Sequence, residues 1–304
     1  MTPPLPLLFR EGKEKKEEKS SMQSIRDIRR RIRSVSSTQQ ITKAMEMVAA
    51  AKLRRAQGRL AQARPYAEKA EEILKNLAGA AADSSHPLLE VRPVKKTLLV
   101  AIASDRGLCG SYNANVIRRA EAFLKDYNFD NCELVLVGKK GFDFYKKRKW
   151  PIRKVFADFG GNLHLAKAKT LANELMKAYE NKEVDQILLL YTRFLSTSTY
   201  RVHLTPFLPL VPEKKGEVLG DYIFEPSPAE IFQHLVPRFS LTRVVLALAE
   251  SFASEHGSRM ISMGGATRNA GEMIDHLTLV RNKARQASIT KEILEVVSGA
   301  EALQ

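Results

Sequence analysis

The sequence predicts an α/β protein in which a Rossmann-like domain is inserted between two long terminal helices that pair as an antiparallel coiled coil. Two observations lead to this prediction. Helical patterns near both ends run on for too many residues to be ordinary globular helices. Between them, short apolar runs alternate with helical stretches, which is typical of a layer of helices on a largely parallel sheet.

Bulk composition limits the classes of function. The 304 residues are 44% hydrophobic and carry a formal charge of +15, which favours an acidic partner such as nucleic acid, a membrane surface or an acidic protein. No run of 18 apolar residues occurs, so the sequence predicts no membrane-spanning helix. Two cysteines, Cys109 and Cys132, argue against a disulfide framework.

Residues 1–21 differ from the rest of the chain. They contain a short apolar piece and then a dense run of charges, without the basic start of a secretory signal. A periodic helical pattern begins directly after Met22. We therefore interpret 1–21 either as a disordered tail or as a mis-assigned start that precedes the true first residue, Met22.

Residues 22–80 are predicted to form the first long helix. Its narrow apolar stripe, which suits a coiled-coil seam, begins with Ile25, Ile28, Ile32 and Val35. Reading apolar residues alone, the stripe resumes at Ile41, Met45 and Val48. That slip breaks the heptad, so an imperfect supercoil is expected.

Residues 227–304 are predicted to form the matching half of the coil. Ser227, Pro228 and Glu230 read as a capping box that begins a short helix ending at Pro237. A longer helix is expected to follow, with Leu248 and Phe252 in the seam against the first helix. Gly264 and Gly265 lie within it, and each costs on the order of 1 kcal/mol of helix stability relative to Ala.

The central α/β domain is predicted to span residues 95–210. Three apolar runs read as buried strands, and a fourth segment after a turn at 197–199 reads as an antiparallel strand. Polar linkers bracket the domain at 81–95 and 211–228. The expected strands are 97–103, 132–138, 185–194 and 200–210, and the expected helices are 113–125, 141–149 and 163–181.

The segment SDRGLCG, residues 104–110, comes directly after a predicted strand and resembles the turn of a nucleotide site or a nucleophile. It lacks the Walker pattern, and its two glycines are a weak signal. Cys109 has no histidine or acid placed by the sequence to activate it. We expect Asp105 and Arg106 to organise the turn, and we expect no catalytic residue, cofactor or metal in this chain.

The positive charge is concentrated in the first helix. Residues 22–64 contain eleven Lys or Arg and two acids, whereas residues 240–304 contain seven of each kind. One interpretation is a basic coiled-coil protein that binds nucleic acid. Against it, residues 22–64 contain no aromatic side chain for base stacking. The other interpretation is that the helix meets an acidic or dipolar protein surface.

Three segments resemble the signatures of the γ subunit of F-type ATP synthase, and the resemblance covers the chain from Met22 onward. They are IRRRIRSVSSTQQITKAMEMVAAAKLRRAQ (28–57), SDRGLCGSYN (104–113) and RMISMGGATRNAGEMIDHLTLVRNKARQASITKEILEVVSGAEA (259–302). The bacterial form is the better match, because no insert carrying a cysteine pair interrupts the α/β domain.

The resemblance implies a non-catalytic rotor shaft that couples proton flow through the membrane sector to ATP synthesis and hydrolysis. The implied partners are the α and β subunits of the catalytic ring, the ε subunit and the ring of c subunits. Contact with the membrane is then indirect, on the cytoplasmic face of the cell membrane, and no nucleic acid is bound. By motif, rotor–stator contacts are implied for Met45, Arg259, Gln286 and Thr290.

Overall fold

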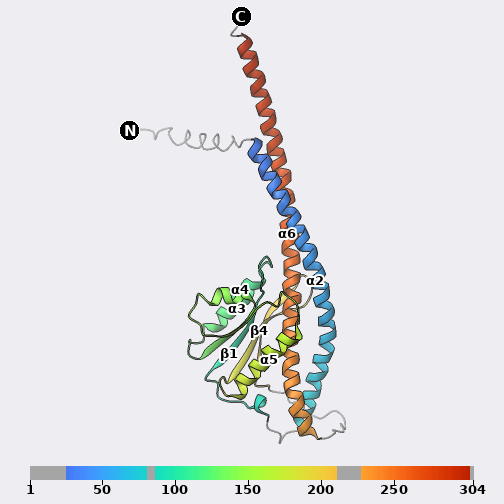
Figure 1. The fold of residues 1–304 in the computed structure, drawn as a ribbon, viewed down its shortest axis with the longest axis vertical. Coiled ribbons are helices and arrows are strands. Elements are labelled where there is room, and N and C mark those ends of the chain that lie inside the picture. Colours follow the sequence, from blue (N-terminus) through green and yellow to red (C-terminus); the bar gives the residue numbers. More distant parts are fainter. Residues whose placement is uncertain (1–24, 81–85, 211–226, 302–304) are drawn as a thin grey trace, which may run out of the picture. The chain divides into compact units, whose positions relative to one another are not determined.

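The computed structural model describes residues 25–80, 86–210 and 227–301. The chain begins with one long helix, α2 (Ile25–Ala80), and ends with another, α6 (Pro228–Glu301); the strands of a five-stranded sheet lie between them in the sequence (Figure 1). The predicted class, long terminal helices with a central α/β domain, is confirmed. Residues 1–21 and most of the linker 211–228 lie outside the described residues.

The sheet has the strand order β3-β2-β1-β4-β5. Strands β1 (Thr97–Ile102), β2 (Cys132–Val137), β3 (Ile152–Phe156) and β4 (Gln186–Phe194) run parallel, and β5 (Tyr200–Leu208) is antiparallel to β4. Strand β3 was not predicted. It is an edge strand with half-exposed residues, so it lacks the continuous apolar run of a buried parallel strand.

Helices cover both faces of the sheet, and the alternation of side chains along the strands assigns the faces. Leu99 and Leu134 lie in one cluster with α3 (Tyr112–Leu124) and with Tyr145 of α4 (Lys139–Tyr145). Leu98 and Val135 lie in the opposite cluster with α5 (Leu165–Glu180) and α6. The helix expected at 141–149 ends early, at Tyr145, shortly before Pro151.

The chain divides into two compact units. The larger unit, 45–263, contains the sheet together with the adjoining parts of α2 and α6. The described part of the smaller unit consists of 25–44 and 264–301, which is a pair of helices. This division places a large part of each long helix with the sheet, whereas the predicted boundaries between helices and domain lie at residues 80, 95, 210 and 227.

The helix pair of the smaller unit is antiparallel, and polar residues set its register. The Oγ1 of Thr267 donates to the Oγ1 of Thr42 at 2.9 Å, and Gly271 faces Gln39 closely enough that a Cβ would lie 3.1 Å from its Nε2. Residue numbers therefore rise along α6 as they fall along α2. Polar residues at seam positions of coiled coils specify register at a cost in stability.

The observed seam of α2 has no break in its heptad repeat, so the predicted break is wrong. Ile41 and Val48, expected in the stripe, are 61% and 57% exposed. The less exposed positions instead step by four and three through Gln39, Thr42 and Glu46 to the buried Ala49 and Leu53. The heptad is therefore continuous, and it was missed because polar side chains occupy three of its positions.

Helix α6 is continuous through Pro237, where the sequence analysis ended a short helix. Ser227 does cap its start, because the backbone N–H of Glu230 donates to the Ser227 Oγ at 3.3 Å. A proline inside a helix costs about 3 kcal/mol. The buried side chains of Phe232, Val236 and Phe239 flank the proline, and each stabilises the fold by about 1.5–3 kcal/mol. Tertiary packing therefore outweighs the local penalty.

Candidate functional site

The loop after β1, residues 103–111, is held by a carboxylate that gathers backbone N–H groups. One Oδ of Asp105 accepts from the amides of Lys139 and Asp158, at 3.2 and 3.1 Å, and the other accepts from Gly160 at 2.7 Å. These amides belong to the segments that follow β2 and β3. Asp105 therefore joins the loops at the carboxyl ends of three parallel strands, which confirms the prediction that it organises the turn.

Cys109 is placed for packing and not for catalysis. Its side chain is 2% exposed, and its Sγ accepts from the Nδ2 of Asn113 at 3.2 Å. Burial raises the pKa of the Cys109 thiol above its usual value, which disfavours the nucleophilic thiolate. Burial likewise raises the pKa of Cys132, on β2, to about 12.

For the ATP synthase complex that the family resemblance implies, replacing Cys109 by Ser, or Cys132 by Ala, is therefore expected to leave ATP turnover within a few-fold of wild type. Dithiol reductants should have no effect, because both cysteines are free and buried. The measurement is ATP hydrolysis by complexes matched for subunit content, with and without reductant. A hundred-fold loss in the Cys109 variant with normal assembly would contradict this assignment.

Arg259, expected at the rotor–stator interface, is engaged inside this chain. Its Nη2 donates to the carbonyl oxygens of Arg106 and Gly107, at 3.2 and 3.3 Å, and its Nε also donates to Gly107 at 3.4 Å. Its Nη1 lies 2.7 Å from the Oε1 of Glu255, a side chain 3% exposed. Only 11% of the Arg259 side chain is exposed. The guanidinium thus connects α6 to the loop after β1.

His256 extends this network to the loop after β3. Its Nε2 lies 2.9 Å from the carbonyl oxygen of Gly161, and its Nδ1 lies 3.3 Å from the Nη1 of Arg259. Because the guanidinium can only donate, Nδ1 must accept, so the proton sits on Nε2 and is donated to Gly161. Burial, helped by the positive charges of Arg259 and Lys52, outweighs the opposing effect of the bond to Gly161 and lowers the pKa of His256 to about 4, so the ring is neutral.

The other three predicted contact residues lie at or near the surface. Gln286 and Thr290 are exposed on α6, and the Thr290 hydroxyl donates to the Gln286 carbonyl oxygen at 3.0 Å. Met45 is half-buried on α2, but its neighbours Met47 and Val48 are 59% and 57% exposed. Met47 was not predicted as a contact residue, because it lies outside the apolar stripe from which the coiled-coil seam is predicted.

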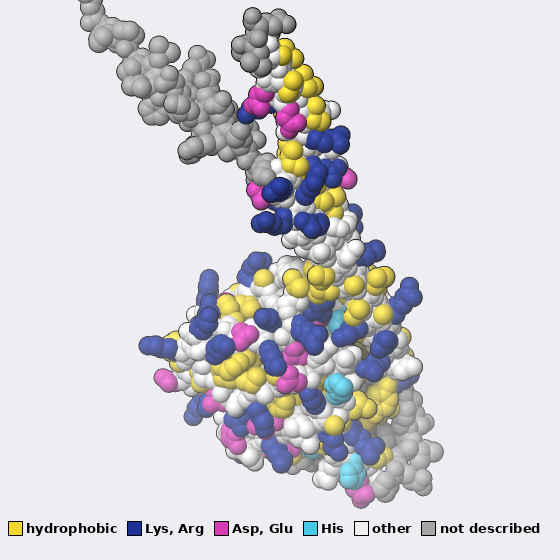
Figure 2. All heavy atoms as spheres, turned by 45° about the horizontal axis from the view of Figure 1, so that its top comes forward, with side chains coloured by type: hydrophobic (Ala, Val, Ile, Leu, Met, Phe, Trp, Pro, Cys, Tyr) yellow, Lys and Arg dark blue, Asp and Glu magenta, His cyan; other side chains and the backbone are white. Residues whose placement is uncertain are grey.

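Part of the basic face of α2 is directed inward. Lys52 donates to Gly160 and Arg59 to Leu163, each through a 3.3 Å bond to a carbonyl oxygen. Arg64 donates to the Phe194 carbonyl oxygen at 2.9 Å and pairs with the buried Glu250 at 3.0 Å. Basic side chains also extend over the sheet-containing unit on the face seen in Figure 2. The concentrated charge of the first helix is therefore partly structural.

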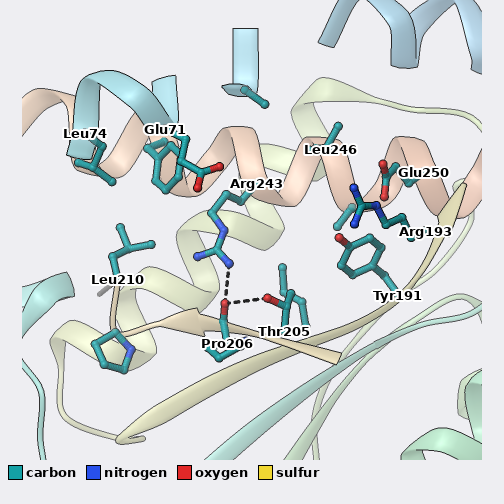
Figure 3. A pocket seen from close by; sticks show the side chains of 15 residues that line it. Glu71, Leu74, Tyr191, Arg193, Thr205, Pro206, Leu210, Arg243, Leu246 and Glu250 are labelled. Atoms are coloured by element: carbon teal, nitrogen blue, oxygen red, sulfur yellow. Dashed lines mark hydrogen bonds between the residues drawn. The ribbon is translucent and has the colours of Figure 1, made fainter. Parts of the chain in front are cut away.

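The larger of two described cavities, about 560 Å³, lies between α2, α6, β4 and β5. The Arg243 guanidinium turns toward the carbonyl oxygen of Pro206, and Tyr191 and Glu250 lie on the other side (Figure 3). Among the described residues that line it there is no cysteine or histidine, so it offers no cysteine nucleophile and no histidine base. Among the described residues, no group of three or more His, Cys, Asp or Glu could hold a metal ion.

Comparisons with known proteins identify the family. A family model described as ATP synthase matches residues 24–303. The ATP synthase gamma chain of Moorella thermoacetica is 48% identical over 275 residues, covering 90% of this chain and 97% of the relative. This chain belongs to the ATP synthase gamma-chain family. The Geobacter metallireducens gamma chain is similar at 46% identity over 279 residues, with the same coverage.

Solved structures agree with the gamma-chain assignment. The central stalk and c-ring structure of Tetrahymena thermophila mitochondrial ATP synthase matches with a TM-score of 0.59 and 27% identity, covering 74% of this chain and 99% of that one. A rotor chain of the Euglena gracilis mitochondrial enzyme shares the fold, with a TM-score of 0.61 at 20% identity, covering 87% and 98%. As a gamma chain, this protein is a central-stalk subunit and not a catalytic one. None of its described helices is long and apolar enough to cross a membrane.

Proposed function

We propose that this chain is the rotor shaft of a bacterial ATP synthase, turning inside a ring of α and β subunits and coupling proton flow to ATP synthesis and hydrolysis. The ε subunit and the c-ring are the proposed partners of the α/β domain. The chain would then lie at the cytoplasmic face of the cell membrane and reach the membrane only through partner subunits. It holds no cofactor in this proposal.

The observation that carries the proposal is the exposed end of α6. The register of the helix pair places Ile25, the first described residue of α2, opposite about residue 285. Every described side chain from 289 to 300 is exposed, although several are large and apolar. They include Ile289, Ile293, Leu294, Val296 and Val297, which are 48%, 57%, 60%, 72% and 50% exposed. An apolar stripe of this kind marks a protein contact, which a surrounding ring of subunits would supply.

The same reasoning supports a second contact region on α2. Ile41, Met47 and Val48 are large apolar side chains that are more than half exposed on a helix otherwise rich in Arg and Lys. Met45 lies between them in the sequence. Outward-facing cations such as Arg29 and Arg54 are exposed and would meet acidic groups of the stator. A rotor must leave each stator position in turn, so these contacts should be many and individually modest, about 1–2 kcal/mol each at most.

Changing Gln286 or Thr290 to Ala tests the proposed rotor–stator contacts. Neither side chain supports the fold, because both are exposed, so stability should change by less than about 0.5 kcal/mol. ATP synthesis should fall on the order of ten-fold, the effect of losing about 1.4 kcal/mol of contact energy. Glu272→Ala, an exposed change on the part of α6 that pairs with α2, is the control and should change neither stability nor ATP synthesis.

The measurement is thermal dissociation and proton-driven ATP synthesis of the purified complex carrying each variant. Normal synthesis in both variants would remove these residues from the proposed interface. The nucleic-acid alternative has its own test: it requires DNA binding at low salt that weakens steeply as salt is added. Failure of the chain to co-purify with α and β subunits would overturn the rotor proposal itself.

A further inference from the structure

The contact between α6 and the loops of the sheet is made mainly to backbone oxygen atoms. Besides the bonds of Arg259 to residues 106 and 107, the Oγ of Ser258 donates to the carbonyl oxygen of Cys109 at 2.6 Å. Three backbone carbonyl groups of this one loop, at residues 106, 107 and 109, are thus bound by two adjacent residues of the helix, 258 and 259. The residue before Ser258, Gly257, lets the helix approach Thr197, whose carbonyl oxygen would lie 3.0 Å from a Cβ.

The loop that α6 binds is itself rigidly connected to the sheet. Asp105 lies next to the two carbonyl groups that Arg259 binds, and its carboxylate accepts from the segments after β2 and β3. Leu108 and Gly110 adopt left-handed backbone conformations, with φ of 59° and 55°. A displacement of the loop would therefore be passed to three parallel strands at once.

The Arg259 side chain has no donor group left for an external partner. Nε and Nη2 are used by the loop, and Nη1 is shared between Glu255 and His256. Glu255 is almost fully buried, and its ion pair with Arg259 compensates its charge. His256 accepts from the guanidinium on one side and binds Gly161 on the other. The orientation of the guanidinium is thus fixed from within the chain.

We propose that Arg259 is a positioning residue that locks the α/β domain to helix α6, and that this joint carries torque between the domain and the shaft. The inference rests on the proposed rotor function and assigns a role to one residue within it. It replaces the stator contact that the family resemblance implies for Arg259. The joint consists of Arg259, Glu255, His256 and Ser258 on α6, and of residues 105–109 and 160–161 in the loops.

The test compares Arg259→Gln with Arg268→Gln in the assembled membrane complex. Arg268 is an exposed arginine on the same helix and serves as the control. Two quantities are measured: hydrogen exchange of backbone amides in 103–111 and 158–163, and the number of protons pumped per ATP hydrolysed. The first reports the joint itself, and the second reports whether torque reaches the membrane sector.

For Arg259→Gln we expect at least ten-fold faster exchange in both loops and a reduced number of protons pumped per ATP, while hydrolysis without a proton gradient continues. Arg268→Gln should leave both quantities unchanged. Arg259→Lys should restore pumping only in part, because one ammonium group cannot bind two carbonyl groups and Glu255 in the fixed fork of a guanidinium. Faster exchange with normal pumping would leave Arg259 a purely structural residue and overturn the torque role.

Unchanged exchange together with impaired catalysis in Arg259→Gln would overturn the joint and support a stator contact. If that variant does not assemble, Ser258→Ala serves in its place, because it removes one hydroxyl, with its bonds to the Cys109 carbonyl oxygen and to the Tyr200 hydroxyl, and leaves Arg259 intact. It should accelerate exchange around residues 109–111 and lower pumping in the same direction but less. The exchange result does not depend on rotation, so a failed joint is distinguishable from a failed rotor assignment, which the Gln286 and Thr290 variants test separately.

Discussion

Replacing Leu248 by Ala should lower the free energy of unfolding by about 2–5 kcal/mol, the usual cost of lost burial plus a cavity. Leu248 is fully buried, in the core cluster that also contains residues of β1, β4 and α5. Phe252, the other α6 residue expected in the coiled-coil seam, lies in the same cluster, with its ring centroid 5.6 Å from that of Phe159. Both side chains thus support the attachment of α6 to the sheet.

The matched variants are Ile32→Ala and Arg54→Ala. Ile32 is half-buried in the helix pair, so its truncation should cost less than that of Leu248. Arg54 is exposed, and its loss should cost about 0–1 kcal/mol. Thermal dissociation of the assembled complex ranks the three variants, Leu248→Ala, Ile32→Ala and Arg54→Ala, by their loss of stability. If Leu248→Ala dissociates like wild type while Arg54→Ala falls apart, the packing of α6 described above is incorrect.

The second large effect is expected at Gly161, and Gly160 provides its control. Both have positive φ, 72° and 60°, so Ala at either position pays a similar backbone penalty of about 1–2 kcal/mol. They differ in space: a Cβ at Gly161 would lie 2.6 Å from the His256 ring, whereas one at Gly160 meets nothing within 4 Å. The ring cannot move aside without losing its bonds to Gly161 and Arg259.

Gly161→Ala should therefore destabilise the complex by about 1–3 kcal/mol more than Gly160→Ala, the usual cost of overpacking. The measurement is thermal dissociation of the two complexes, with hydrogen exchange of residues 158–163 as a local readout. Equal effects of the two substitutions would show that backbone conformation alone matters here and that His256 is free to shift.

The sequence predicted the elements with strong one-dimensional signals. The buried strands 97–102, 132–137 and 186–194 were found because they are continuous apolar runs, and both long helices were found from their length. Strand β3 was missed because an edge strand buries little and carries charges: Arg153 pairs with Glu133, Glu174 and Glu183. Helix α6 was divided at Pro237 because its supporting contacts come from distant residues.

The candidate site was less accessible to sequence reasoning. The role of Asp105 was foreseen from its position after a strand, but its bonds to the amides of Asp158 and Gly160 span more than fifty residues. The internal use of Arg259 was not foreseen, because a single arginine in a helical pattern looks the same whether it binds a neighbouring loop or another subunit. The distances in the structure show that Arg259 binds the neighbouring loop.

The backbone character of the joint has a consequence for how freely its loop can vary. Helix α6 recognises carbonyl oxygens, which every amino acid supplies, and the side chains of Arg106 and Leu108 point to solvent, the latter 62% exposed. Substitutions at these two positions should therefore leave the hydrogen bonds between helix α6 and the loop backbone unchanged. Gly110 is different, because a Cβ there would lie 2.4 Å from the Ser262 Oγ. In this loop, selection should therefore act on the conformation of the main chain more than on its side chains. Gly110, which must lack a side chain, should be its most constrained position.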